Sequence, residues 1–370
     1  MHDPTPEEHA WFERELEARR RRVYALIDEP RFGAAFRPDH TRDAIYHYPG
    51  QRGKALRPLM LLLSAGAVGG DEDRALPAAA AVELFHTWTL VHDDIIDRDT
   101  TRRGRPTVHT AFAARGAADL GLAAAEAAHY GEAVAILAGD QQQGWVYALL
   151  AELPERGVAP QVALQLIREL ALEVETALLE GEMLDVQFSH EPITALSEAA
   201  VLDMLSKKTA VLYRFAARAG ALIGLDQTRP PAAEGERLCR ALETFAATCG
   251  TAFQLQDDLL GITGDERRLG KPVGSDLREG KKTLIIFHAL RNGTPAQIAT
   301  LQAVLGNPHA TPEAVAAAIA ALEATGSLAY VRGMAQETID RAYRALEVLP
   351  DTPYRRLLTL WAHFLVAREF

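Results

Sequence analysis

Two aspartates in the first third of the chain have the spacing of a metal site. Asp93 and Asp97 stand four residues apart in the stretch from His86 to His109, so on a helix both project from one face, one turn apart. Carboxylates this close in a partly buried site need a cation between them, or one of them must take up a proton. Mg²⁺ prefers oxygen ligands and commonly binds through one or two carboxylates plus phosphate oxygens, so the pair favours a magnesium site.

Two arginines follow these carboxylates in a segment punctuated by glycine and proline. Arg102 and Arg103 carry the guanidinium groups that would bind the diphosphate oxygens a metal leaves free. Acidic runs at helix ends are commonly just solvated, so the first motif alone is weak evidence for function.

A second acidic motif occurs between 253 and 283. Asp257 and Asp258 follow an apolar, helix-like segment, and Asp265 comes a short loop later. The lysines that follow are Lys271, Lys281 and Lys282. Two acidic motifs, each at the end of a predicted helix and each followed by basic residues, indicate function far more strongly than either one alone.

The segment GKALRP, from Gly53 to Pro58, supplies a candidate phosphate site. Lys54 and Arg57 stand three residues apart at a predicted helix start, where free backbone N–H groups and the helix dipole already favour an anion. Lysine and arginine at helix ends are usually just exposed, so this segment too gains its meaning from the other motifs.

Composition excludes several classes of protein. A net charge of −11 argues against nucleic-acid binding, which normally needs a basic face. The two cysteines, Cys239 and Cys249, have no His or Cys at ligand spacing, so neither a zinc site nor a disulfide is expected. Residues 1–29 are densely charged, and the best apolar run, Leu59 to Val68, is about half of the ~18 residues of a membrane span. We therefore expect a cytoplasmic protein without a transmembrane segment.

Alanine and leucine dominate the apolar residues, which predicts an all-α fold. No long linker separates two domains, so we predict one helical domain over 1–370 that carries its motifs between 53 and 283. Residues 30–53 are predicted to form turns, and the arginine cluster 19–22 a solvated face. The predicted helices are 7–28, 55–68, 75–97, 108–129, 131–151, 159–188, 195–223, 234–262, 281–291, 296–304, 311–323, 327–347 and 353–368. If the acidic motifs lie on facing helices, their carboxylates would look across a shared central cavity.

The motifs occur together in one order. GKALRP, DDIID followed by RRG, KKTA, FQLQDDLLGITGD, GKPVGSD and EGKKT all fall within 53–283, and together they resemble those of the trans-prenyltransferases, the polyprenyl (isoprenyl) diphosphate synthases. The resemblance implies the isoprenoid synthase type I fold, an all-α bundle around a central cavity. It also implies a Mg²⁺-dependent head-to-tail condensation of isopentenyl diphosphate with an allylic diphosphate, a cluster of Mg²⁺ ions bridging the diphosphate, and a homodimer.

The resemblance also assigns roles to residues. The implied metal ligands are Asp93, Asp97, Asp257 and Asp258. The residues implied to bind isopentenyl diphosphate are Gly53, Lys54, Arg57, His86 and Arg103, with Arg102 on the side of the allylic diphosphate. Those implied to contact the allylic diphosphate or steady the reacting carbon are Lys208, Thr209, Gln254, Lys271 and Lys281. Gly261 stands where a third aspartate would complete the second motif, which leaves the roles of Asp258 and Asp265 less defined than that of Asp257.

These residue types suit the implied chemistry. Breaking an allylic C–O bond leaves extra negative charge on the diphosphate, and metal ions, lysines and arginines placed where that charge develops lower the barrier. Thr209 and Gln254 are polar enough to stabilise positive charge but are poor nucleophiles. An apolar pocket must keep water from the carbocation.

Product length depends on the helix that carries the first motif. Phe85 and Thr89 share a stripe with Asp93, and Trp88 lies beside it. A large ring close to the metals shortens the pocket, so we expect a short product, geranylgeranyl diphosphate ahead of farnesyl diphosphate. Phe85 and Trp88 can equally be core aromatics, and His92, which points away from Asp93, is expected to orient a neighbour or to pack rather than to bind metal.

Three other classes of protein share part of this pattern. A class I terpene cyclase needs an Asn/Ser/Glu metal motif that is not found, and a head-to-head synthase of the squalene type is disfavoured by the same motifs. A non-catalytic regulatory subunit of a heteromeric prenyl synthase would be expected to lose one acidic motif, whereas both occur here.

Overall fold

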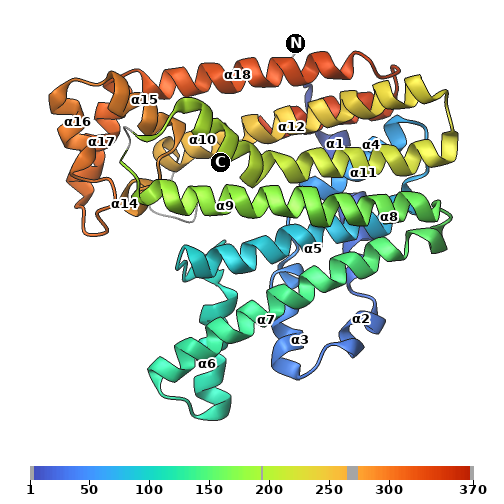
Figure 1. Cartoon of the computed structure of the whole chain (residues 1–370), viewed down its shortest axis with the longest axis horizontal. Helices are drawn as coiled ribbons and strands as arrows, with labels where there is room; N and C mark the ends of the chain where they lie inside the picture. The colour runs from blue at the N-terminus through green and yellow to red at the C-terminus, as the bar shows by residue number, and fades with distance from the viewer. Residues whose placement is uncertain (1–3, 193–194, 265–273, 367–370) are drawn as a thin grey trace. The chain divides into compact units, whose positions relative to one another are not determined.

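The computed structural model describes residues 4–192, 195–264 and 274–366 and is helical over most of them (Figure 1). Within these ranges the strands are β1 (Thr101–Arg102) and β2 (Arg105–Pro106), which pair antiparallel as a short hairpin. The all-α class predicted from composition is therefore confirmed.

The chain divides into two compact units, which we describe one at a time. Unit 1 comprises 1–168, 216–239 and 352–357, and unit 2 comprises 169–215, 240–351 and 358–370, as far as these residues are described. The prediction of one domain over residues 1–370 stays a prediction.

Unit 1 contains the helices of the N-terminal half. They are α1 (Pro6–Ile27), α2 (Pro30–Ala35), α3 (Asp39–Ile45), η1 (Pro49–Gln51), α4 (Leu56–Ala67), α5 (Glu72–Ile96), α6 (Val108–Leu120), α7 (Ala124–Ala151), η2 (Leu153–Arg156) and α8 (Pro160–Glu169), whose last residue belongs to unit 2. α1 begins with a capping box, in which Thr5 and Glu8 each accept from the other's backbone N–H. α5 is the central element, because α1, α4 and α7 all pack against it.

Unit 2 contains most of the remaining helices. They are the π-helical turn η3 (Leu170–Val174), α9 (Glu175–His190), α10 (Glu198–Leu205), the π-helical turn η5 (Ser206–Ala210), α14 (Ser275–Glu279), α15 (Leu284–Asn292), α16 (Pro295–Gln302), α17 (Pro312–Ala324) and α18 (Ser327–Leu346). The helices α11 (Val211–Thr228), α12 (Ala232–Thr263) and α19 (Pro353–Val366) contribute residues to both units. An apolar core formed largely by α10, α15, α17 and α18 holds the described part of unit 2 together.

The structure corrects several predicted boundaries. The helix predicted for 108–129 ends at Leu120, because Gly121 adopts the left-handed conformation (φ 68°) that closes many helices. The helices predicted for 159–188 and 195–223 are each interrupted by a π-helical turn, and 30–53 contains short helices as well as turns.

The prediction of a solvated arginine face on α1 is partly wrong. Arg21 is exposed, but Arg19 is buried and its Nη2 lies 2.6 Å from Glu72 Oε1 of α5. Arg22 Nη1 reaches the other oxygen of Glu72 over 3.0 Å. A buried carboxylate needs such compensation, so part of this cluster fastens α1 to α5.

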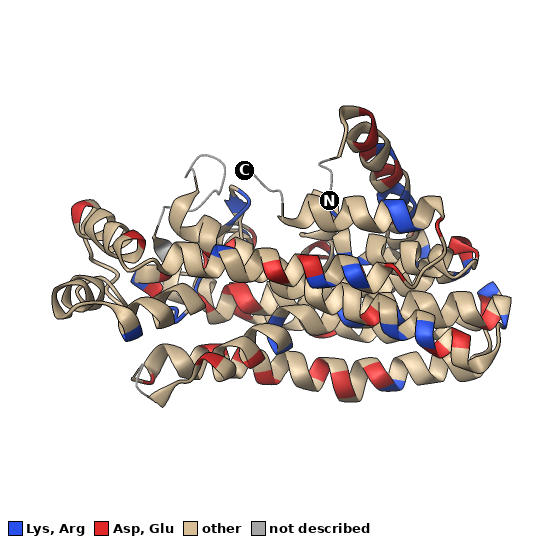
Figure 2. Cartoon of the chain, turned by 90° about the horizontal axis from the view of Figure 1, so that it is seen from above, with Lys and Arg blue, Asp and Glu red and all other residues tan. Residues whose placement is uncertain are grey.

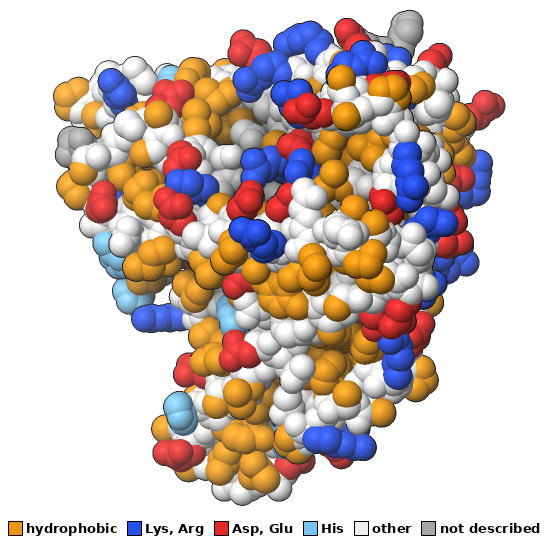
Figure 3. Space-filling view, turned by 45° about the vertical axis from the view of Figure 1, so that its right-hand side comes forward, with side chains coloured by type: hydrophobic (Ala, Val, Ile, Leu, Met, Phe, Trp, Pro, Cys, Tyr) orange, Lys and Arg blue, Asp and Glu red, His pale blue; other side chains and the backbone are white. Residues whose placement is uncertain are grey.

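Other predictions from composition can be compared directly. Cys239 and Cys249 are both buried thiols. Acidic and basic residues are interspersed along the helices in Figure 2 and on the face shown in Figure 3. No single helix of the described residues is long and apolar enough to cross a membrane, although α17 and α18, bent by 60°, pass that test as a pair.

Close helix packing in unit 1 depends on Gly220. A Cβ at Gly220 of α11 would stand 2.0 Å from the carbonyl oxygen of Leu61 in α4, so the two backbones would have to separate. We expect Gly220→Ala to lower the free energy of unfolding by about 2 kcal/mol, measured by urea denaturation.

Gly144→Ala is the matched control, because Gly144 lies exposed within α7 with only Gln141 Nε2, at 4.0 Å, near its Cβ position. Helix propensity should make this change stabilising by about 0.5–1 kcal/mol. Equal effects of the two substitutions would contradict the packing argument.

Candidate active site

The first acidic motif lies at the C-terminal end of α5. Asp93 and Asp97 are partly exposed, and the backbone N–H of Asp97 donates to the carbonyl of Asp93 over 2.7 Å. The two side chains therefore leave the helix one turn apart, as predicted. A helix C-terminus carries partial negative charge, so two carboxylates at this end would be stabilised by a cation.

Asp94, between them, was not predicted to have a role. Its carboxylate is fully buried, accepts a hydrogen bond from the Tyr48 hydroxyl, and contacts Arg102 Nε at 2.7 Å and Nη2 at 2.6 Å. Arg102, predicted to face the allylic diphosphate, is thus tied to α5 by a side-on ion pair. This pair fixes the β-hairpin against the end of α5.

The hairpin turn presents Arg103. Arg103 and Gly104 connect β1 and β2 and both have positive φ, 53° and 71°, as in a two-residue type I′ turn. Glycine tolerates this conformation, but arginine is strained there by roughly 1 kcal/mol or more. Residues are held in such conformations most often at functional sites, and Arg103 lines a pocket.

This pocket, which we call the hairpin pocket, lies wholly within unit 1. It is lined by Tyr24, Tyr48, Gln51, Gly53, Glu83, His86, Thr87, Leu90, Arg102 and Arg103. Of the residues predicted to bind isopentenyl diphosphate, the structure brings Gly53, His86 and Arg103 together here. Arg57 lies close enough to influence the pKa values of Glu83 and His86. Lys54 is exposed beside Gly53, just before α4 begins.

Buried charge dominates the hairpin pocket. Burial raises the pKa of Glu83, while Tyr24, Arg57 and Arg103 act to lower it. Burial, and then the positive charges of Arg57 and Arg103, hold the pKa of His86 well below its ordinary value. His86 is therefore a neutral hydrogen-bonding group at neutral pH, and the positive charge of the pocket comes from arginine.

The residues predicted to set product length occupy different surroundings. Phe85 is fully buried, and Trp88, 5% exposed, packs edge-on against Phe85 and His92. Thr89 is partly exposed and donates to the carbonyl of His86. His92 lies over Gly139 of α7, whose Cβ position is 2.2 Å from Nε2, so its predicted packing role is confirmed.

Unit 2 joins three predicted residues in one hydrogen-bonded chain. The hydroxyl of Thr209, in the π-helical turn η5, donates to Gln254 Oε1 over 2.8 Å, and Gln254 Nε2 donates to Asp258 Oδ1 over 3.0 Å. Both Thr209 and Asp258 are buried. These two hydrogen bonds direct Gln254 Oε1 toward Thr209 and Nε2 toward Asp258. The sequence alone does not indicate this orientation.

Asp258 belongs to a group of carboxylates. Burial first, then the charges of Asp276, Asp257 and Asp185, raise the pKa of Asp258 to about 8. Its Oδ2 is buried and has no hydrogen-bond partner among the described residues. A Cβ at Gly261 would stand 2.8 Å from Asp276 Oδ2, so a carboxylate from α14 occupies the space left where the motif lacks its third aspartate.

The predicted lysines of unit 2 divide into three cases. Lys208 Nζ lies 2.8 Å from Glu182 and 2.6 Å from Asp185, both on α9, which sequence reasoning missed. Lys281 Nζ lies 3.1 Å from Glu279 Oε2. Lys271, like Asp265, lies outside the described residues.

The acidic residues fit Mg²⁺ in chemical type. All the candidate donors are carboxylate oxygens, the ligands that hard cations prefer, and Asp258 offers a buried oxygen that has no hydrogen-bond partner among the described residues. Within the described ranges no group of three or more His, Cys, Asp or Glu side chains is placed to hold a metal ion. Mg²⁺ in proteins commonly takes one or two carboxylates together with phosphate oxygens, which a bound diphosphate would supply.

Comparison with known proteins gives the family. The model of the polyprenyl synthetase family matches residues 38–322. A geranylgeranyl diphosphate synthase of Methanosarcina mazei is 36% identical over 96% of this chain and 98% of that protein, and an octaprenyl diphosphate synthase of Escherichia coli is 34% identical over 88% of each. The crystal structure of a geranylgeranyl pyrophosphate synthase from Corynebacterium glutamicum, complexed with isoprenyl diphosphate and magnesium, is 28% identical and matches with a TM-score of 0.76 over 98% of both chains. The chain belongs to the polyprenyl synthetase family.

The neutral state of His86 predicts a pH effect on stability. Below about pH 6.5 an unfolded histidine gains a proton, whereas the folded His86, with its lowered pKa, does not. Between pH 7.5 and 5.5, wild type should lose about 1 kcal/mol more of its free energy of unfolding than His86→Gln, measured in urea. Parallel pH dependences of the two proteins would show that the imidazole is not held neutral.

Proposed function

We propose that this protein is a Mg²⁺-dependent prenyltransferase that joins isopentenyl diphosphate head to tail with an allylic diphosphate, and that its product is geranylgeranyl diphosphate. The observation that carries the proposal is the hairpin pocket, where Gly53, His86 and Arg103 meet beside the first acidic motif. The family and the name of the Methanosarcina mazei relative support the same activity.

Unit 1 would bind the nucleophilic substrate. Lys54, Arg57 and Arg103 supply positive charge for the diphosphate of isopentenyl diphosphate, with Gly53 allowing the backbone to approach closely. His86, held neutral, supplies a hydrogen bond without adding charge. Arg102 is proposed to face the allylic diphosphate while its Asp94 contact holds it in place.

Unit 2 would supply several of the proposed contacts to the allylic substrate. Lys208, Lys271 and Lys281 are proposed to contact its diphosphate, and the linked Thr209 and Gln254 to stabilise the positively charged carbon. The proposed ligands of Mg²⁺ are Asp93, Asp97, Asp257 and Asp258. When bound, the metal would neutralise the charge that develops on the departing diphosphate.

Relatives of nearly equal identity are named for different products. Farnesyl diphosphate is the alternative product, and a regulatory subunit without activity the alternative from another class. Homodimerisation and a cytoplasmic location remain predictions.

The test is an assay of the purified chain with labelled isopentenyl diphosphate and allylic primers of three lengths. We expect incorporation, loss of incorporation on chelation, and recovery with Mg²⁺. Asp97→Asn should lower kcat by about a hundredfold or more, because charge stabilisation at the leaving group is lost. Incorporation that survives thorough chelation would contradict the metal role, and no incorporation at all would favour the regulatory subunit.

The identity of the product tests the role of Trp88. Trp88→Ala removes a large buried ring one turn before the first motif, so we expect longer products by mass spectrometry. Trp145→Ala, which removes a buried ring of the same size from α7, is the control and should leave the product distribution unchanged. An unchanged distribution in Trp88→Ala would make this ring an ordinary core residue.

A further inference from the structure

Tyr24 reaches the hairpin pocket from α1, a helix that carries none of the sequence motifs. Its hydroxyl donates to Glu83 Oε1 over 2.6 Å, and both side chains are buried, with exposed fractions of 4% and 6%. Burial raises the pKa of Tyr24, so the hydroxyl keeps its proton and remains a donor.

Gly53 packs directly against this pair. A Cβ at Gly53 would stand 3.1 Å from both Glu83 Oε1 and the Tyr24 hydroxyl oxygen, and 3.5 Å from Arg103 Nη1. Four elements therefore meet at one point: α1, the loop before α4, α5 and the hairpin turn. The loop and the hairpin turn carry residues proposed to bind isopentenyl diphosphate.

Glu83 is the only acidic side chain that lines the pocket as described, and the positive charges of Arg57 and Arg103 lie close enough to act on its pKa. A buried carboxylate that lacks a donor costs more to keep ionised, so the Tyr24 hydrogen bond helps Glu83 to retain the charge that holds these arginines. Without that hydrogen bond, the orientation of the arginines would be less fixed.

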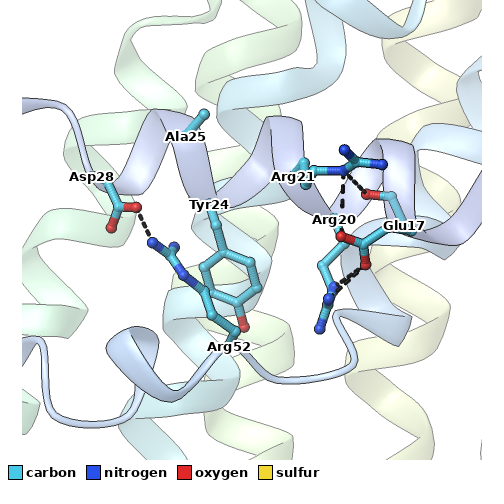
Figure 4. Close-up of a pocket in the computed structure, with 7 residues that line it drawn as sticks. All are labelled: Glu17, Arg20, Arg21, Tyr24, Ala25, Asp28 and Arg52. Carbon is cyan, nitrogen blue, oxygen red and sulfur yellow. Dashed lines mark hydrogen bonds and ion pairs between the residues drawn. The ribbon is translucent and has the colours of Figure 1, made fainter.

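The ring of Tyr24 is itself held from the other side. Figure 4 shows that it forms a wall of a surface pocket on α1, with Arg52 beside the ring and Asp28 bonded to Arg52. The Arg52 guanidinium carbon lies 4.9 Å from the ring centroid, the distance of a cation–π contact. Arg52 directly precedes Gly53. The loop that is proposed to bind substrate therefore also contacts the ring of Tyr24.

We propose that Tyr24 is a positioning residue for the diphosphate of isopentenyl diphosphate, acting through Glu83 on Arg57, Arg103 and the Gly53 loop. This inference rests on the proposed function. It assigns to α1, which carries no motif, a part in binding one of the two substrates. Because the network above includes none of the residues proposed to bind the allylic diphosphate, KM for the allylic substrate should not change when the Tyr24 hydroxyl is lost.

The test compares Tyr24→Phe with Tyr46→Phe. Both changes delete one hydroxyl from a tyrosine of unit 1, and Tyr46 donates instead to the carbonyl of Ile27 over 3.2 Å, outside the hairpin pocket. Tyr24→Phe should raise KM for isopentenyl diphosphate about tenfold, with KM for the allylic substrate unchanged and kcat within about twofold. Tyr46→Phe should leave all three unchanged.

A second variant and a binding measurement separate positioning from folding. Glu83→Gln keeps the shape but removes the charge, so it should raise the same KM, and calorimetry should show weaker binding of isopentenyl diphosphate alone to both variants. Unchanged KM and binding in both variants of an active enzyme, or equal losses for the two substrates, would overturn the positioning role. An inactive wild type would instead overturn the proposed function, on which that role rests.

Discussion

A row of buried carboxylates along α5 holds unit 1 together. Glu72, Glu83 and Asp94 are spaced by eleven residues, close to three helical turns, so they lie on one stripe of the helix. All three are buried, and each is met by an arginine, a tyrosine or both from another segment. An unpaired buried charge costs several kcal/mol, so each pair fixes where its partner segment lies.

This row explains how weakly structured segments come to carry binding groups. The hairpin is only two residues wide on each side, and its turn holds Arg103 in a strained conformation. Such a hairpin is not stable in isolation, but the Arg102 contact with Asp94 fastens it to α5, the central helix of unit 1. The strain at Arg103 can persist because the adjacent ion pair between Arg102 and Asp94 fixes the position of the turn.

The placement of the first acidic motif at a helix end and the helix start within GKALRP could be predicted because they depend on local geometry. Four residues along a helix bring Asp97 beneath Asp93 whatever the rest of the chain does. The partners of Glu83 and Asp94 could not be predicted, because Tyr24 and Tyr48 lie 59 and 46 residues away in segments without a motif. The sequence alone does not indicate that a tyrosine on an N-terminal helix lines this pocket.

Unit 2 shows the same limit in another form. The π-helical turn at 206–210 shifts the register of the helix by one residue. No residue type in this segment predicts such a turn. Likewise, Gly261 suggests a motif with a missing carboxylate, whereas Asp276 places one against that glycine from fifteen residues further along the chain.

The carboxylates gathered around Asp258 raise its pKa by mutual repulsion and burial, and a divalent cation would reverse both effects. Under the proposed function, the diphosphate of the substrate would supply further oxygen ligands to that cation.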